Sequence, residues 1–236
     1  MKSLLFTGAC AMFALGITAG VMAAPNTAGG PTSNGASVSL NAFRGALLLD
    51  EATSTSRSVQ MDALNWIDGL MKSHPAQAKS VSVYQALTDL ALSGTRRPAI
   101  SGSTVINSFP LIRTQAVRDI GTLGGSQALA PLLQVLRYDA DPVVLSEVAY
   151  ELGKLGANPN NEVTNALAQS ILHTPVRASD EIYAYNALAA LTRLSGTSAA
   201  AAQAVYTEIT TVREMGFQGP VRQEAKTILS GLMGVG

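Results

Sequence analysis

The residues of this chain that could do chemistry are few, and their spacing completes no catalytic or metal-binding pattern. The two histidines are His74, which precedes a proline, and His173, and neither belongs to a metal-binding spacing such as His-Glu-x-x-His. Glu147 and Glu151 lie one turn apart on an expected helix, but no histidine or second carboxylate pair accompanies them. The sequence therefore predicts no catalytic residue, no metal site and no cofactor.

Two segments that contain glycine followed by serine, 124–126 and 196–198, superficially resemble the turn around a serine nucleophile. Neither completes Gly-x-Ser-x-Gly, and each stands where one expected helix ends and the next begins at Ser126 or Ser198. The chain also has no glycine-rich loop ending in Gly-Lys-Ser/Thr. We therefore interpret both segments as helix boundaries and expect a protein that is not an enzyme.

Charge and composition point away from nucleic acid and toward packed helices. The 16 Lys and Arg residues balance 16 Asp and Glu residues, so the chain has no positive excess to neutralise phosphates. Apolar residues make up 47% of the chain and aromatic residues 5%, so a core must consist mainly of Ala, Leu, Val and Ile. Small aliphatic side chains of this kind suit closely packed helices.

The first residues have the pattern of a secretory signal peptide. Lys2 is followed by an apolar run over residues 4–22, and Val21 and Ala23 supply short side chains at the two positions that define a cleavage site. We predict a signal peptide over 1–23, cleavage after Ala23, and a periplasmic or secreted bacterial protein. Cleavage would remove Cys10, the only cysteine, and leave no transmembrane helix in the mature chain. An uncleaved membrane anchor is the alternative, which three glycines within the run make weaker.

Two further segments lie outside the expected helices. Residues 24–38 are rich in Gly, Pro, Ser, Thr and Asn, which predicts a flexible linker before a folded body over 39–236. Residues 94–109 predict an irregular loop that interrupts this body, and a loop of that length is usually functional or mobile. Its Arg96 and Arg97 could meet an acidic partner or could simply be solvated.

The folded body contains an internal repeat, because residues 112–124 match residues 144–156 at an offset of 32. A period of roughly 20–50 residues is typical of stacked supersecondary units. Apolar residues recur at positions i, i+4, i+8 and i+11, which places a stripe along one side of a helix. The stripes are Val59, Ala63, Ile67 and Leu70; Ile112, Ala116, Ile120 and Leu123; Val144, Val148, Leu152 and Leu155; Tyr183, Ala187, Leu191 and Leu194; and Val221, Ala225, Leu229 and Leu232.

Partner helices are expected between the striped ones, over residues 80–93, 126–138, 161–173 and 198–215, and residues 40–51, which precede the first stripe, also have helical composition. Asp141 followed by Pro142 predicts a helix start, with the carboxylate as cap and proline at the first helical position. Gly156 just after a stripe predicts a helix end. Each pair would form an antiparallel hairpin, and we expect about five of them.

The segment over 124–144 reads Gly-Gly-Ser-Gln-Ala-Leu-Ala-Pro-Leu-Leu-Gln-Val-Leu-Arg-Tyr-Asp-Ala-Asp-Pro-Val-Val, and the helix that follows ends in Leu-Gly-x-Leu-Gly over 152–156. Together these residues resemble HEAT repeats of the short type similar to those of phycobilisome lyases. In that family the first helix often carries a proline at the place of Pro131, and the second begins Asp-Pro-x-Val-Arg. Leu145 departs from this pattern, whereas Arg113 and Arg222 keep the arginine. The resemblance implies an all-α fold, an α-solenoid of about five HEAT-like antiparallel helix pairs.

In the third repeat, Thr192 and Ser195 stand where the glycines of the pattern would be. The resemblance also implies that the second helix of each pair lines a concave face. Polar and aromatic residues that the helical turn places away from the stripe would then form a binding surface for a protein partner. The predicted binding residues are Arg113, Arg118, Glu147, Tyr150, Glu151, Tyr185 and Arg222.

Together these features predict a non-enzymatic protein- or peptide-binding scaffold in the bacterial cell envelope. Two alternatives stay open. A protein resembling the lyase branch would attach or hold a cofactor. A structural assembly subunit would instead self-associate through the last helix, because no polar capping repeat follows it.

Overall fold

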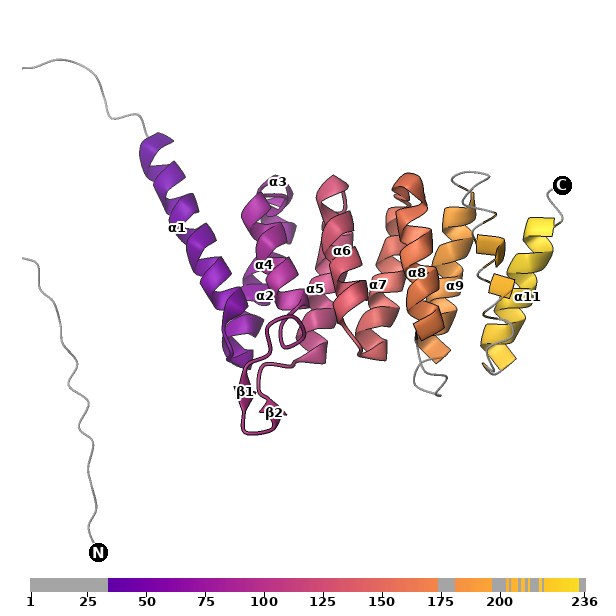
Figure 1. Cartoon of the computed structure of the whole chain (residues 1–236). Helices are drawn as coiled ribbons and strands as arrows, with labels where there is room; N and C mark the ends of the chain where they lie inside the picture. Colours follow the sequence, from indigo (N-terminus) through magenta and orange to yellow (C-terminus); the bar gives the residue numbers. More distant parts are fainter. Residues whose placement is uncertain are drawn as a thin grey trace, which may run out of the picture.

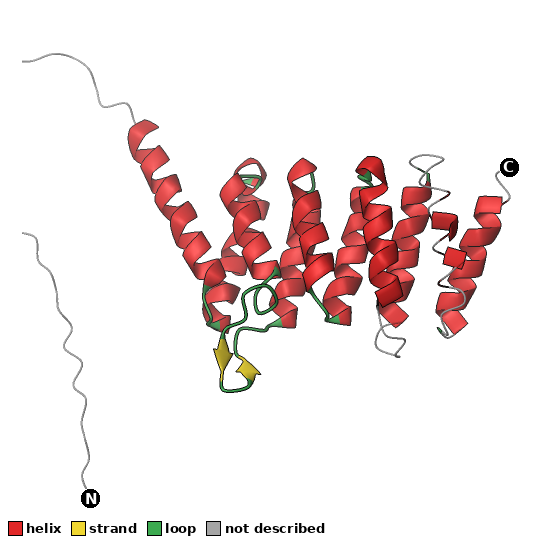
Figure 2. Cartoon of the chain, viewed as in Figure 1, coloured by secondary structure: helices red, strands yellow, loops and turns green. Residues whose placement is uncertain are grey.

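The computed structural model of the chain is a linear array of helices that stand side by side (Figures 1 and 2). It describes residues 34–173, 181–196, 203, 205–207, 209–210, 212, 217 and 219–233. The predicted signal peptide and residues 24–33 of the predicted linker lie outside this part of the chain, and so does most of the helix expected over 198–215. The protein is an all-α solenoid.

The described elements follow one another as helices joined by short connections, apart from one hairpin of strands. They are α1 (Asn34–Thr53), α2 (Arg57–Ser73), α3 (Pro75–Ala78), α4 (Val81–Ala91), β1 (Ile100–Ser101), β2 (Thr104–Val105), α5 (Pro110–Leu123), α6 (Ser126–Tyr138), α7 (Pro142–Leu155), the 3-10 turn η1 (Pro159–Asn161), α8 (Glu162–His173), α9 (Glu181–Ser195) and α11 (Gly219–Met233).

Local sequence signals account for both ends of α7. The Asp141 side chain accepts hydrogen bonds from the backbone N–H groups of Val143 and Val144, so it caps α7 as predicted. Gly156 ends the same helix in the left-handed conformation, at a φ of 67°. The prediction that the linker extends to residue 38 is wrong, because α1 begins at Asn34. No proline follows Pro31 until Pro75, so nothing in the backbone prevents the helix from starting early.

The helices form two rows, which follow from the predicted pairing. The first row is α1, α4, α6 and α8, and the second row is α2, α5, α7, α9 and α11; each helix packs against its neighbours in its own row. Across the rows α1 packs on α2, α4 on α5, α6 on α7 and α8 on α9. Stripe residues such as Ile112, Leu152 and Leu191 are fully buried between them. Leu155 is only partly buried, as are Val59 and Leu70 in α2.

The glycines that follow stripe residues explain how closely the helices of the second row approach. A Cβ atom on Gly153 of α7 would lie 2.8 Å from the Ala190 Cα atom of α9, and one on Gly121 of α5 would overlap the Glu151 side chain of α7. Thr192 occupies the equivalent position in α9 and is exposed, so α11 does not cover it in the same way. The departure from the repeat pattern therefore marks the place where this close packing ends.

The interruption over 94–109 is more ordered than an irregular loop. Strands β1 and β2 pair antiparallel, with Ile100 opposite Val105, and the hairpin projects beyond one end of the helices (Figure 2). The turn between them contains Gly102 at a φ of 63°. β-branched residues on either side of a Gly-Ser dipeptide are a hairpin signal, and the expectation of irregular structure overlooked it.

Candidate binding surface

The exposed side chains of the second row are linked from one helix to the next. The Arg118 guanidinium of α5 donates two hydrogen bonds to the Glu147 carboxylate of α7, from Nε to Oε1 at 2.9 Å and from the second terminal nitrogen to Oε2 at 3.1 Å. The Arg193 guanidinium of α9 lies over the Tyr150 ring of α7, 5.6 Å from its centroid. These contacts hold the side chains in place on the outside of three neighbouring helices.

Tyr150 and Tyr185 are the large aromatic residues of this surface, with 45% and 42% of their area exposed. Their helices are held in register by a hydrogen bond from Asn186 Nδ2 to Ser146 Oγ, at 2.7 Å. Ser146 precedes Tyr150 by one turn, and Asn186 is adjacent to Tyr185. The structure therefore brings together four predicted binding residues: Arg118, Glu147, Tyr150 and Tyr185. We call these four the second-row surface.

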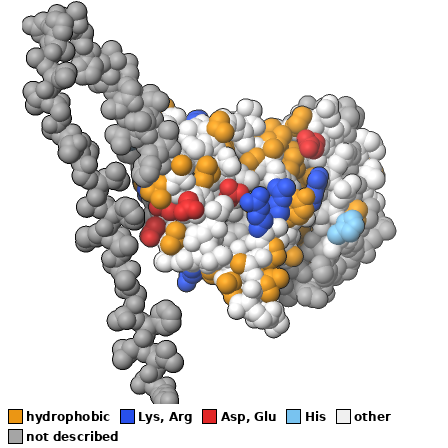
Figure 3. Space-filling view, turned by 60° about the vertical axis from the view of Figure 1, so that its left-hand side comes forward, with side chains coloured by type: hydrophobic (Ala, Val, Ile, Leu, Met, Phe, Trp, Pro, Cys, Tyr) orange, Lys and Arg blue, Asp and Glu red, His pale blue; other side chains and the backbone are white. Residues whose placement is uncertain are grey.

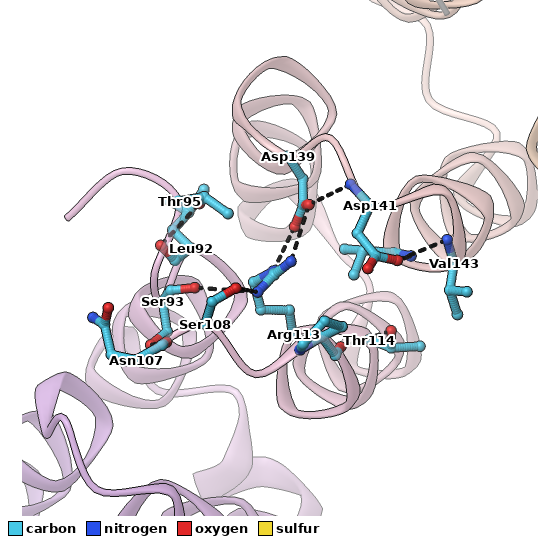
Figure 4. A network of polar contacts seen from close by, with 12 residues as sticks. Leu92, Ser93, Thr95, Asn107, Ser108, Arg113, Thr114, Asp139, Asp141 and Val143 are labelled. Atoms are coloured by element: carbon cyan, nitrogen blue, oxygen red, sulfur yellow. Dashed lines mark hydrogen bonds and ion pairs between the residues drawn. The ribbon is translucent and has the colours of Figure 1, made fainter. Parts of the chain in front are cut away.

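Arg113 does not belong to this surface, so its assignment to a partner-facing position is wrong. It is 3% exposed, and it donates to both carboxylate oxygens of Asp139, at 2.6 and 3.2 Å (Figure 4). It also donates to Ser108 Oγ at 3.1 Å and to the Ser93 carbonyl oxygen at 3.5 Å. Arg113 directly follows the stripe residue Ile112, and a step of one residue turns it toward the neighbouring row rather than to the outside.

Glu151 is likewise buried, at 2% exposure, because it directly precedes the stripe residue Leu152. Its carboxylate accepts hydrogen bonds from Lys154 Nζ at 2.9 and 3.2 Å and lies over Gly121 of the preceding helix. Burial raises the pKa of Glu151, and the Lys154 ammonium partly opposes this. Glu151 therefore joins α5 to α7 and does not face a partner.

Arg222 is exposed, but it lies on α11, which packs against α9 and not against α7. The structure therefore does not bring it together with the second-row surface. On the face drawn in Figure 3, charged side chains of both signs lie beside hydrophobic ones.

Asp119 is a buried group that the sequence reasoning did not single out. It is 4% exposed, its Oδ1 accepts a hydrogen bond from Gln115 Nε2 at 2.8 Å, and its Oδ2 has no hydrogen-bond partner. Burial raises the pKa of Asp119 to about 6; the negative charge of Asp68 adds to this, while Gln115, Arg118 and Lys72 oppose it. The repeat itself carried the signal, because Asp119 aligns with Glu151, and both are acidic residues next to a stripe residue.

A cavity of about 540 Å³ between α6 and α8 was also missed. Leu145 lines it, together with Leu133, Tyr183 and polar residues of α8 that include Asn165 and Gln169. Leu145 aligns with Arg113, so the cavity lies where the repeat has lost an arginine that fills the corresponding place one unit earlier. Burial raises the pKa of the Tyr183 hydroxyl.

No described group of three or more His, Cys, Asp or Glu residues is arranged to hold a metal ion. None of the described helices combines the length and the apolar composition needed to cross a bilayer.

The repeat-containing part of the chain matches a known family model. Residues 105–189 match the family model described as HEAT repeats. Over that segment the chain is similar to HEAT repeat proteins. The HEAT segment spans α5 to α8 and most of α9, and it contains every predicted binding residue except Arg222. No curated protein and no solved structure matches the chain.

Proposed function

We propose that this protein is a non-enzymatic scaffold of the bacterial cell envelope that binds a protein or peptide through the second-row surface. HEAT repeats commonly serve as protein-interaction scaffolds, and the HEAT segment holds all four residues of this surface. The single observation that carries the proposal is the half-exposed Tyr150 ring, held by Arg193 in the middle of three linked helices.

The second-row surface suits binding because contacts with neighbouring side chains already hold Tyr150 and Arg118 in place before a partner arrives. Tyrosine offers a large contact area for two rotatable bonds, and tyrosine and arginine are enriched among residues that dominate binding energy. Because Arg193 fixes the Tyr150 ring and Glu147 fixes Arg118, less conformational entropy is lost on binding. Glu147 also neutralises Arg118, so the surface favours a partner that contributes apolar contacts and hydrogen bonds rather than a strongly charged one.

Export is the second part of the proposal, and its support is the N-terminal pattern of one lysine, an apolar run and a site for cleavage after Ala23. Fractionation of cells that express the C-terminally tagged chain tests it. We expect the tag in the periplasmic or culture fraction, on a chain whose N-terminal residue is Ala24. A full-length chain in the cytoplasm would contradict export and would leave the binding proposal to be tested separately.

The binding test uses purified protein as bait for an envelope extract, followed by mass spectrometry. We expect one partner that the wild-type protein retains and that both Tyr150→Ala and Arg118→Glu lose. Tyr206→Ala is the matched control, because Tyr206 is also an exposed tyrosine but lies outside the second-row surface. Retention of the partner by both surface variants, or its equal loss with Tyr206→Ala, would show that another surface binds it.

The cavity between α6 and α8 favours the ligand-carrier alternative, since a space of about 540 Å³ is large enough for a small organic molecule. Leu145→Trp would fill the cavity without touching the second-row surface. An apolar fluorescent dye that binds the wild-type protein and is lost in this variant would support the carrier function. Most of the described exposed side chains of α11, such as Arg222, Gln223 and Lys226, are polar, which does not favour the alternative of assembly through this helix.

A further inference from the structure

Buried hydrogen bonds hold the two ends of the 94–109 loop against the solenoid. Figure 4 shows some of the residues that form them. Ser93 Oγ accepts a hydrogen bond from Gln60 Nε2 at 2.8 Å and donates to the Asn107 carbonyl oxygen at 3.1 Å. The buried Asn107 side chain accepts from the Ala99 backbone N–H at 2.8 Å and donates to the Arg97 carbonyl oxygen at 3.0 Å. The loop is therefore held in one position relative to α2 and α4.

The two ends of the loop also cross at van der Waals distance. Gly94 has a φ of 73°, and a Cβ atom there would lie 2.6 Å from the Ser108 Cα atom, so no other residue fits without movement. Ser108 in turn accepts a hydrogen bond from Arg113, whose guanidinium is fixed by the buried ion pair with Asp139. The repeat unit behind the loop thus supports it, and long supported loops on a rigid scaffold are frequent sites of function.

A small cavity of about 210 Å³ lies at the base of the loop, where the end of α1 meets the end of α4 and the loop. Asp89, Arg96 and Arg97 line it, so its charged groups sum to one positive charge. Arg96 is oriented by a hydrogen bond to Gln134 Oε1 at 3.2 Å and by the Tyr138 ring, 5.6 Å away. No described carboxylate forms an ion pair with Arg96 or Arg97. Burial raises the pKa of Asp89, and the charges of Arg97 and Arg96 lower it.

Exposed aliphatic side chains lie on or next to the hairpin formed by β1 and β2. Ile100, Val105 and Ile106 are all exposed, although they belong to or adjoin a pinned hairpin. Each strand has a second edge that no described strand pairs with, and because each strand is two residues long, one residue of each can offer its backbone N–H and C=O groups there. An extended segment that alternates apolar and acidic residues would match both the strand edge and the two arginines.

We propose that the 94–109 loop is a second docking site, which binds an extended acidic segment of a partner protein through Arg97 and Arg96 and through the aliphatic side chains of the hairpin. This site goes beyond the second-row surface, because it lies on the loop and at the ends of α1 and α4.

Fluorescence polarisation with two labelled peptides tests the site on the full mature chain. One peptide alternates valine and glutamate, and the other alternates valine and lysine. We expect the acidic peptide to bind and the basic peptide not to bind. Arg97→Gln should weaken binding of the acidic peptide about tenfold, because it removes a charge-assisted contact. Asp89→Asn should strengthen it about threefold, because it removes the competing negative charge.

Lys79→Gln is the charge-matched control, since Lys79 is exposed at the opposite end of α4 and should leave binding unchanged. Val105→Ser tests the apolar part and should weaken binding without altering the preference for the acidic peptide. Equal binding of both peptides, equal loss with Lys79→Gln and Arg97→Gln, or wild-type binding by Arg97→Gln would each overturn the site. Tyr150→Ala should bind the acidic peptide normally, so the outcome does not depend on the second-row surface.

Discussion

The buried carboxyl group of Asp119 should make the protein less stable near neutral pH than in mild acid. Its pKa is raised from an ordinary value of 3.8 to about 6, because it is buried between α2 and α5 with one oxygen unpaired. A pKa that is about two pH units higher in the folded chain corresponds to roughly 3 kcal/mol of destabilisation once the group is ionised. Asp119→Asn removes this ionisation while keeping the shape of the side chain and one oxygen that can accept from Gln115.

The direction in which stability changes with pH follows from how tightly the folded and unfolded chains bind the Asp119 proton. The folded chain holds the Asp119 proton more tightly than the unfolded chain, so the free energy of unfolding falls as pH rises from about 4 to about 6 and is then constant with respect to this group. The asparagine variant lacks that fall. At pH 7 we expect it to be more stable than the wild-type protein by about 2 to 3 kcal/mol, and at pH 4 by little or nothing.

Urea unfolding followed by circular dichroism between pH 4 and pH 7.5 measures the effect as the difference between wild type and variant. Taking this difference cancels the other carboxyl groups with raised pKa values, such as Glu151 and Asp89. Asp62→Asn is the matched control, because Asp62 is exposed on α2 and should give the wild-type pH profile. Parallel profiles for the wild type and Asp119→Asn would refute the reasoning.

Two further predictions concern the close approach of α7 and α9 and the buried Arg113–Asp139 ion pair. Gly153→Ala should lower the free energy of unfolding by about 1 to 3 kcal/mol, because its methyl group would meet the Ala190 backbone. Gly69→Ala is the control and should be neutral or stabilising, because a methyl group there would meet nothing. Equal melting temperatures for the two variants would contradict the close approach of α7 and α9. Arg113→Met should lower the free energy of unfolding, measured by urea titration, by about 3 to 5 kcal/mol, because Asp139 would be left buried without its partner. The double variant Arg113→Met with Asp139→Asn should recover part of that loss, because it removes the unpaired charge. No recovery in the double variant would show that the ion pair is not the cause.

The helical pairing was predictable because it depends on signals that act within one turn or one repeat. The stripe at i, i+4, i+8 and i+11, the cap at Asp141 and the glycine at Gly156 each specify local structure. The described helices from α2 to α9 that were predicted agree with the predicted ranges to within a few residues, whereas α1 begins at Asn34 rather than at residue 40. The binding surface was predictable only in part. Arg118, Glu147, Tyr150 and Tyr185 are grouped together, whereas Arg113 and Glu151 are buried.

The binding surface was predictable only in part because a stripe defines which side of a helix is buried but not how wide that buried side is. In a helix of the second row, neighbours on both sides and a partner row behind it bury residues on either side of the stripe as well, which places Asp119 and Glu151 inside. By itself, the sequence determined the repeat, most of the helix boundaries and the all-α architecture. Only the tertiary structure decided which polar side chains are enclosed, because enclosure depends on how closely adjacent repeats approach, and at Gly121 and Gly153 they approach to contact distance.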